Sequence, residues 1–304
     1  MQKYLNKIKY LFTGRFPVIA VPYLWLALFF LLPFLIVLKI SVAEMETTAI
    51  SPLLSYVEGK LNVKINFSNF MSLFNDEDQY YLWTYLRSIA FAAVTTLLCL
   101  MIGYPFAYFM ARSPIERRPA LLMLVMLPFW TSFLLRIYAW KGILETNGLL
   151  NNLLLWLGVI NEPIHMMHTK FSLILGMVYT YLPFMILPLY SNLVKLDNRF
   201  LEASADLGAT PLQTFWRITI PLSKAGIIAG SMLVFIPCIG EFVIPELLGG
   251  PETLMIGRVL WDEFFSNNDW PRASAVAVVM ILLIIVPLAI FNKYEAEQMG
   301  SKKR

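Results

Sequence analysis

Two carboxylates, Glu241 and Glu246, interrupt a strongly apolar part of this chain. They lie in the run G-E-F-V-I-P-E-L-L-G-G-P, residues 240–251. A carboxylate at membrane depth costs about 2.5–3.5 kcal/mol on insertion scales, so such residues face a cavity or a partner. Two roles fit the pair. Either the two acids attract a cationic molecule, or one of them holds helices together through an ion pair with Arg136 or Arg258.

The spacing of the two glutamates bears on the first role. Five positions on an ideal helix rotate a side chain by about 140°, so a regular helix cannot aim both at one point. Pro245 and the Gly249-Gly250-Pro251 run argue against a regular helix. An unwound segment is expected instead, and it would allow the two carboxylates to converge.

Aromatic rings and oxygen atoms form a second group of candidate contacts. Trp130 and Thr131 follow Pro128 in an apolar run, Tyr138 lies two turns later, and Asp262 belongs to a later loop. A ring face attracts an ammonium group with about 2 kcal/mol when water is excluded. We predict that these four residues line a path for an organic cation together with the glutamates. Core packing for Trp130 and an interfacial aromatic belt are the alternatives.

Membrane helices must position these side chains. The chain is 58% hydrophobic and 14% charged, with a mean hydropathy of +0.65, unlike a soluble domain. A bilayer core of about 30 Å requires about 20 apolar residues in a helix. We predict an all-α membrane protein of six transmembrane helices, several kinked or broken at prolines. The six stretches are 17–40, 88–111, 120–140, 171–190, 225–248 and 273–291.

The basic residues predict the orientation. Lysine and arginine concentrate at both ends of the chain and in the segments 112–118 and 191–224. The positive-inside rule places these segments, and both termini, in the cytoplasm. The predicted organisation is a cytoplasmic segment 1–16, a six-helix domain 17–292 and a cytoplasmic tail 293–304. The net charge of +4 then reflects topology and gives no support to nucleic-acid binding.

The polar loop 191–224 has the pattern of two short helices. Residues 202–205 read Glu-Ala-Ser-Ala, a helix-forming run of small residues, and Gly208 ends it. Thr210 and Pro211 are typical of a helix start, and the second helix is expected to run up to Pro221. A polar segment of this kind cannot be a lipid-facing span.

This loop resembles the EAA loop of ABC-importer permeases, in which Glu-Ala-Ala is followed by Gly and then Ile-x-Leu-Pro. Ser204 replaces the second alanine and Ile220 replaces the leucine, both small changes in size. In that family the loop docks onto the ATPase subunit. The resemblance therefore implies an ATPase-coupling role for Glu202, Ala203, Ser204, Asp206, Gly208, Ile218 and Pro221.

The sequence carries no enzyme signature. It contains no G-x-x-x-x-G-K-S/T, no G-x-S-x-G and no H-E-x-x-H. We expect a chain that is not an enzyme and binds no cofactor, with ATP and magnesium on a separate ATPase subunit. His165 and His168 have only scattered carboxylates nearby, so no metal site is expected. Cys99 and Cys238 are expected to be buried thiols.

A closer resemblance extends from the first apolar stretch to Asn292. It rests on residues 240–251, on L-P-F-W-T-S-F-L-L-R-I-Y-A-W at 127–140, and on N-G-L-L-N-N-L-L-L-W-L-G-V-I at 147–160. These runs are similar to the permease subunits of polyamine importers, the putrescine (PotH) type first and the spermidine (PotB) type next. They belong to the binding-protein-dependent transport inner membrane component family.

The resemblance implies a type I (MetI-like) importer permease with cytoplasmic coupling helices, in the bacterial inner membrane. It implies four kinds of partner: a second homologous permease subunit, two ATPase subunits, an extracytoplasmic polyamine-binding protein and membrane lipid. The implied cargo is a polyamine, putrescine before spermidine.

Other functions remain open on the residues alone. The same permease would suit spermidine or another small solute, since the acids favour a cation and only the resemblance names a polyamine. An ion-driven secondary carrier also places acids in broken helices, but it needs no EAA-like loop. A membrane enzyme would need a nucleophile or a metal constellation.

Overall fold

The computed structural model describes the main chain of residues 15–46, 49–51, 54–57, 60–75 and 79–301. The predicted N-terminal segment therefore lies almost wholly outside the described residues, as do the last three residues of the predicted tail. The chain divides into two compact units, which are Met1–Glu77 with Glu263–Ile281, and Asp78–Asp262 with Leu282–Arg304. Each is described by itself.

The first unit begins with one apolar helix assembled from three pieces. These are α2 (Arg15–Leu26), the π turn η1 (Ala27–Leu31) and α3 (Leu32–Ser41). The side-chain amide of Asn69, on α4 (Ser68–Asn75), donates to the carbonyls of Ser41 and Ala43 at 3.1 and 2.8 Å. This amide therefore ties α4 to the end of the apolar helix. The unit also contains the π turn η5 (Asp262–Ser266) from Glu263 onward and the first part of α16 (Trp270–Ser301).

Two small hairpins lie in the loop after the first apolar helix, where the all-α prediction expected no strands. β1 (Met45–Glu46) pairs antiparallel with β2 (Ala49–Ile50), and β3 (Leu54–Val57) with β4 (Lys60–Val63). Polar and apolar residues alternate along β4, and a glycine separates β3 from β4 in the sequence. That pattern is typical of a hairpin.

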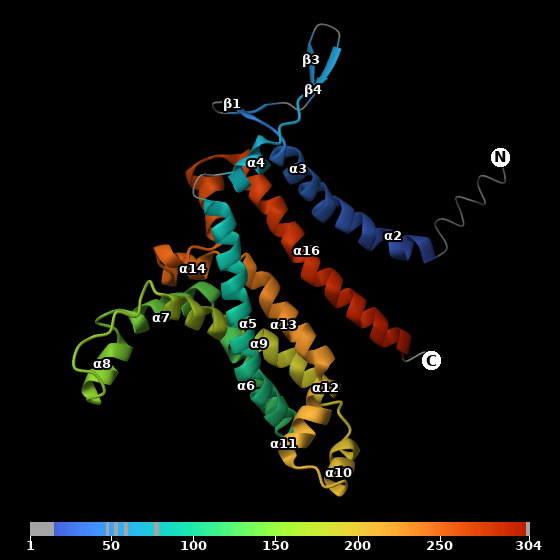
Figure 1. Cartoon of the computed structure of the whole chain (residues 1–304), viewed down its shortest axis with the longest axis vertical. Helices are drawn as coiled ribbons and strands as arrows, with labels where there is room; N and C mark the ends of the chain where they lie inside the picture. Colours follow the sequence, from blue (N-terminus) through green and yellow to red (C-terminus); the bar gives the residue numbers. More distant parts are fainter. Residues whose placement is uncertain (1–14, 47–48, 52–53, 58–59, 76–78, 302–304) are drawn as a thin grey trace, which may run out of the picture. The chain divides into compact units, whose positions relative to one another are not determined.

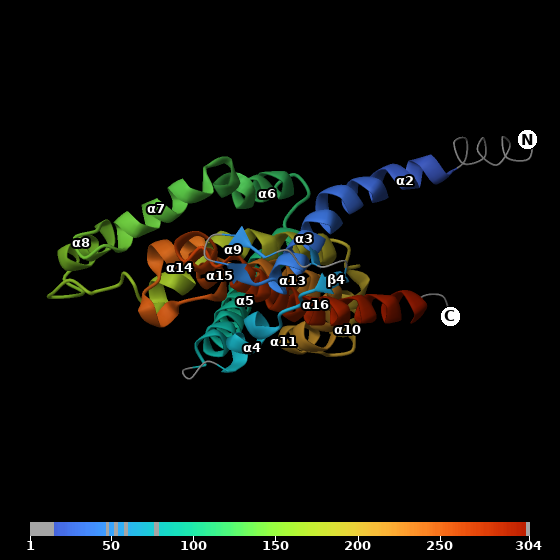
Figure 2. The same ribbon diagram turned by 90° about the horizontal axis from the view of Figure 1, so that it is seen from above.

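Three long helices form the centre of the second unit: α5 (Tyr80–Arg112), α9 (Lys170–Leu193) and α13 (Lys224–Ile239). They pack side by side (Figures 1 and 2). The remaining elements of this unit up to Asp262 are α6 (Arg118–Met126), η2 (Leu127–Trp130), α7 (Phe133–Leu144), α8 (Leu149–Trp156), α10 (Arg199–Asp206), α11 (Pro211–Thr214), η3 (Phe215–Thr219), α12 (Ile220–Leu222), α14 (Val243–Leu248), η4 (Pro251–Thr253) and α15 (Ile256–Trp261).

Small residues allow α9 and α13 to approach closely. A Cβ atom on Gly230 would lie 3.1 Å from the carbonyl oxygen of Met185, and one on Gly226 would lie 2.7 Å from Cβ of Asn192. The two glycines are four positions apart, so they share a helix face, as in the small-xxx-small pattern of membrane helices. Met185 and Leu189 are fully buried at this contact. Larger side chains would push the helices apart.

The structure agrees only partly with the six predicted spans. Among the described residues, three helices are long and apolar enough to cross a membrane: Val18–Ser41, Tyr80–Arg112 and Lys170–Leu193. Two bent pairs would raise the number to five, while Trp270–Val286 is a shorter apolar helix. The predicted helices are apolar as expected, and the exact number of spans stays a prediction.

Two predicted spans are broken, as their prolines suggested. Stretch 120–140 bends by 85° where Thr131 and Ser132 interrupt the helix just after Pro128. In stretch 225–248, α13 ends at Ile239 and α14 begins at Val243, after three intervening residues. By contrast, α5 and α9 continue unbroken through Pro105, Pro183 and Pro188. A proline alone therefore does not predict where one of these helices breaks.

Candidate functional site

The predicted coupling loop is a helix–turn–helix at one end of α5 and α13 (Figure 1). α10 ends at Asp206, and Gly208 adopts a left-handed φ of +79°, which a residue with a side chain rarely adopts. Thr210 then caps α11 in a capping box with Gln213. The helix does not stop at Pro221, since the π turn η3 and α12 carry it to Leu222.

A side-chain contact joins the two arms of this loop, and most of their other side chains are exposed. The hydroxyls of Ser204 on α10 and Thr214 on α11 lie 2.6 Å apart, and Ser204 is buried. Glu202, Ala203 and Asp206 are exposed on the outer side of α10. Three large apolar side chains are exposed as well, Leu207 (88%), Leu212 (68%) and Trp216 (62%). A polar loop that exposes large apolar residues is typical of a docking surface.

The loop is anchored to one face of α5. The Arg112 side chain donates to the side-chain oxygen of Asn198, just before α10. The hydroxyl of Tyr104 lies 2.8 Å from the hydroxyl of Ser223, just after α12. The ring of Phe215 contacts the ring of Tyr104 edge-on at 5.5 Å. Movement of the loop must therefore move, or be moved by, α5.

The turn that leads into α10 is held by an exposed ion pair. Arg199 donates to the carboxylate of Asp197 from Nε at 2.9 Å and from Nη2 at 2.6 Å. This side-chain hydrogen bond, with a second one from the backbone N–H of Arg199, lowers the pKa of Asp197. Because the pKa is lowered, the contact favours the folded turn at neutral pH and is lost only as acid protonates Asp197.

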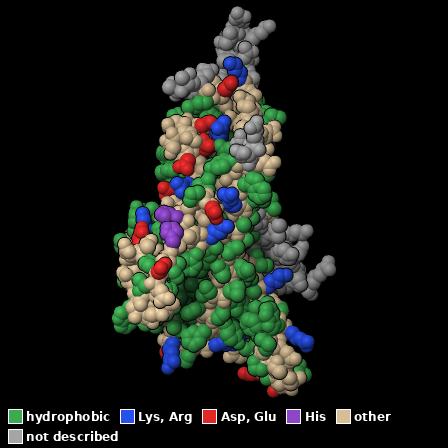
Figure 3. Space-filling view, turned by 60° about the vertical axis from the view of Figure 1, so that its left-hand side comes forward, with side chains coloured by type: hydrophobic (Ala, Val, Ile, Leu, Met, Phe, Trp, Pro, Cys, Tyr) green, Lys and Arg blue, Asp and Glu red, His purple; other side chains and the backbone are tan. Residues whose placement is uncertain are grey.

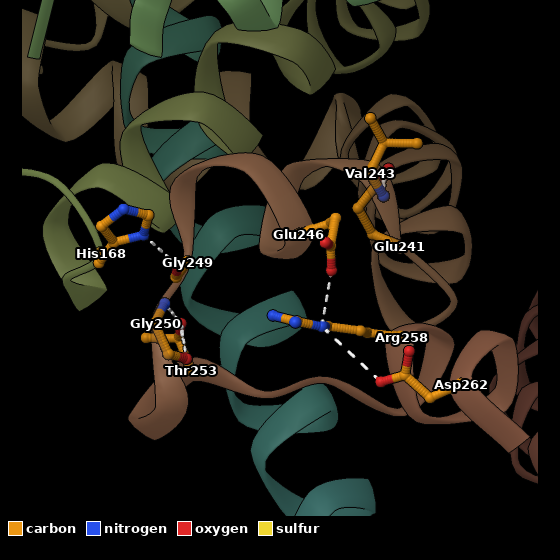
Figure 4. Close-up of polar contacts among 9 residues, drawn as sticks. All are labelled: His168, Glu241, Val243, Glu246, Gly249, Gly250, Thr253, Arg258 and Asp262. Carbon is orange, nitrogen blue, oxygen red and sulfur yellow. Dashed lines mark hydrogen bonds and ion pairs between the residues drawn. The ribbon is translucent and has the colours of Figure 1, made fainter. Parts of the chain in front are cut away.

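The outer carboxylates Glu246 and Asp262 lie on either side of Arg258 (Figure 4). Nε of Arg258 lies 2.7 Å from a carboxylate oxygen of Glu246 and 3.9 Å from one of Asp262. The side chain of Arg258 is 30% exposed, that of Glu246 43% and that of Asp262 45%. The ion pair that we considered as an alternative for one glutamate is thus present for Glu246. Both carboxylates remain partly exposed.

Glu241 lies at the break between α13 and α14 and does not converge on Glu246. Its Oε1 accepts from the backbone N–H groups of Phe242, Val243 and Ile244, at 3.2, 3.0 and 3.4 Å. Its Oε2 accepts from the hydroxyl of Tyr181. Figure 4 shows Glu241 bonded to Val243, while Glu246 points to Arg258.

The aromatic candidates lie on the broken third stretch. Trp130 is 73% exposed at the end of η2, and Tyr138 is 54% exposed on α7. The hydroxyl of Thr131 donates to the carbonyl of Pro128 at 2.8 Å. Neighbouring Arg136 lies over the rings of Phe129 and Phe133, 5.5 and 6.0 Å from their centroids. α7 contacts α14, which brings this stretch next to the helix that carries Glu246.

Two sets of contacts were not predicted from the sequence: the α5 face under the coupling loop and Tyr181 beside Glu241. Tyr104, Tyr108 and Arg112 recur every four residues, a spacing that predicts a shared helix face. Tyr181, in contrast, is one aromatic residue within an apolar helix, and nothing in its neighbours signals a partner sixty positions away.

The helix-turn-helix loop and broken membrane-length helices around α5, α9 and α13 define the permease class of ABC importers. The chain belongs to the family described as "Binding-protein-dependent transport system inner membrane component", whose model matches residues 16–296. It is a transport subunit and not an enzyme. Within the part of the chain that the structure describes, no group of three or more His, Cys, Asp or Glu side chains could hold a metal ion.

Relatives and solved structures agree with this family. The chain is 40% identical over 94% of its length to "Spermidine/putrescine transport system permease protein PotB" of Haemophilus influenzae, covering 94% of that protein. It is 42% identical over 92% of its length to the Escherichia coli protein of the same name, covering 96% of it. A bacterial alginate ABC transporter chain superposes with a TM-score of 0.65 at 18% identity, over 95% of each chain. The last comparison shows the fold alone.

Proposed function

We propose that this chain is a permease subunit of an ATP-driven importer of polyamines, with putrescine as the first candidate cargo and spermidine as the second. The observation that carries the proposal is 40–42% identity, over nearly the whole chain, to permeases named for spermidine and putrescine transport. The fold alone does not carry it, because the superposed transporter imports alginate, an acidic polysaccharide.

Accessible carboxylates support a cationic cargo. Glu246 and Asp262 each leave a part of their surface exposed beside Arg258. An ammonium group of the cargo would compete with the guanidinium for these oxygens. Trp130, Thr131 and Tyr138, on the adjoining broken stretch, offer exposed rings and a hydroxyl for the alkyl chain and the second amine. Weak contacts suffice, since an external binding protein supplies selectivity and a tight site would slow release.

The loop α10–α11 is proposed to transmit the work of ATP hydrolysis. Its exposed apolar residues Leu207, Leu212 and Trp216 would enter a cleft of the ATPase, with Glu202 and Asp206 at the edge. The small side chain of Ala203 would allow the ATPase to approach the exposed face of α10 closely. When the two ATPase subunits close on ATP and magnesium, the loop moves with them as a lever and opens the proposed cargo path outward.

Further partners follow from the surface of the helices. Hydrophobic side chains form a wide continuous area on the face in Figure 3, and charged ones gather beyond its edges. An apolar groove of ≈ 390 Å³ runs between α5 and α13, lined by residues such as Leu97, Ile228 and Phe235. A second permease chain and lipid are proposed to cover this area. The cluster of basic residues at both ends of the chain supports cytoplasmic termini in a bacterial inner membrane.

Uptake of labelled putrescine tests the cargo directly. We expect cells that lack this gene, and any other putrescine importer, to lose uptake and to regain it with the gene. Unlabelled spermidine in excess should reduce the restored uptake if the two amines share the path. Restored uptake that spermidine does not affect would mean a putrescine-selective importer. Unchanged uptake without the gene would contradict the cargo.

The source of energy separates this proposal from an ion-driven carrier. In vesicles that contain the complete transporter, uptake should require ATP and persist when the proton and sodium gradients are collapsed. Uptake that follows a gradient and ignores ATP would favour the secondary carrier instead.

A further inference from the structure

The short helix α14, which carries Glu246, is held against α9 at both of its ends. At its C-terminal end the hydroxyl of Ser172 donates to the carbonyl of Leu248 at 2.8 Å. The backbone N–H of His168 donates to the same carbonyl at 3.1 Å. Nδ1 of His168 lies 2.8 Å from the carbonyl oxygen of Gly249 (Figure 4). These bonds fix where the helix ends.

Its N-terminal end is held through a side chain. Glu241 bridges the first backbone N–H groups of α14 and the hydroxyl of Tyr181. Tyr181 is 8% exposed and Glu241 is half-buried. Ser172 and Tyr181 lie on one helix, nine positions or about 13.5 Å apart. The six residues of α14 therefore rest on α9 between two polar anchors.

At the break between α13 and α14, the unwound residues are closely packed against α15. A Cβ atom on Gly257, in the first turn of α15, would lie 2.5 Å from the carbonyl oxygen of Gly240. The ring of Phe242 stacks on that of Trp261 at 4.4 Å. α15 therefore packs directly against the unwound residues 240–242. Since α15 also carries Arg258, its orientation and that of α14 depend on the same junction.

We propose that Tyr181 is a positioning residue, which acts through Glu241 to fix α14 and so to present Glu246 to the cargo. The proposal rests on the proposed transport function and changes the role of Glu241 within it. Both carboxylate oxygens of Glu241 already accept hydrogen bonds, so a cargo amine would have to displace them. Glu241 then serves the junction, and Glu246 and Asp262 serve the cation.

Hydrogen exchange of the assembled transporter tests the anchor without any cargo. Tyr181→Phe removes one hydroxyl and keeps the ring, so the packing against Phe184 at 6.2 Å is retained. We expect about tenfold faster exchange of the backbone amides of 243–248 other than Pro245, because a hydrogen bond to a charged group is lost. Tyr179→Phe is the matched control, since the Tyr179 hydroxyl has no hydrogen-bond partner among the described residues, and it should leave exchange unchanged. Unchanged exchange in Tyr181→Phe would overturn the proposal.

Uptake by the same variants separates positioning from direct contact. Glu241→Gln and Tyr181→Phe should each lower the maximal rate about tenfold at an unchanged half-saturating cargo concentration, with ATPase assembly intact. The double variant should be no slower than the slower single variant, because both changes break one junction. A near-normal Tyr181→Phe beside an inactive Glu241→Gln would mean that Glu241 contacts the cargo, which overturns the proposal.

Hydrogen exchange and uptake test the role of Tyr181 and the identity of the cargo separately. Should the unaltered transporter move neither putrescine nor spermidine, the cargo would be wrong, and the exchange experiment would still decide the role of Tyr181. Co-purification of the partner subunits with each variant excludes simple misfolding.

Discussion

Replacing Gly208 by proline is expected to separate ATP hydrolysis from uptake. Gly208 has φ +79°, and proline fixes φ near −65°, so the turn between α10 and α11 cannot persist in the variant. The exposed apolar residues on the two arms would then no longer meet the ATPase in one geometry. We expect hydrolysis to continue while uptake falls at least tenfold, a change that corresponds to about 1.4 kcal/mol in coupling.

The measurement is the number of ATP molecules hydrolysed per putrescine taken up, in vesicles with the complete transporter. Gly208→Ala is the graded variant: the space around Gly208 is open, so alanine meets only the conformational cost of about 1–2 kcal/mol for a left-handed residue. Gly158 is the matched control, because it has φ +67°, is equally open and lies far along the chain from the coupling loop. Gly158→Ala should leave the ratio unchanged. A normal ratio in Gly208→Pro would contradict the lever.

The helix–turn–helix of the proposed coupling loop was predictable because its signals are local. A glycine after a run of small helix formers and a threonine before Pro211 each determine backbone geometry within a few residues. The structure places the turn at Gly208 and the cap at Thr210, as expected. The end at Pro221 was wrong because a π turn, Phe215–Thr219, precedes the proline and the chain stays helical through it.

The outer region was less predictable because its contacts join distant segments. The sequence indicated an unwound stretch near the two glutamates, and the break between Ile239 and Val243 is there. It did not indicate that Glu241 would turn back onto the N–H groups of the following helix, nor that Tyr181 would meet it. Those contacts depend on how α9 and α13 pack, and close packing at Gly226 and Gly230 determines that.

The second large effect is expected from Glu246. Glu246→Gln should lower the rate of putrescine uptake at least tenfold if the carboxylate contacts the cargo, since hydrogen bonds to a charged group contribute about 1.5–3 kcal/mol. If Glu246 served only the ion pair with Arg258, we would expect a smaller loss. The side chains of Arg258 and Glu246 are 30% and 43% exposed, and exposed pairs contribute about 0.2–1 kcal/mol.

Neutralising both partners decides between the two roles of Glu246. If the carboxylate only balances Arg258, the variant Glu246→Gln/Arg258→Gln should recover the uptake that either single change loses, because no uncompensated charge remains. If it contacts the cargo, the double variant should stay as slow as Glu246→Gln, while Arg258→Gln alone keeps or raises the rate by freeing both carboxylates. Glu252→Gln is the matched control, an outer glutamate that is 85% exposed and 3.8 Å from Lys170. Full recovery of uptake in the double variant would mean that Glu246 does not line the cargo path. Asp262 would then be the acid of the proposed path that remains.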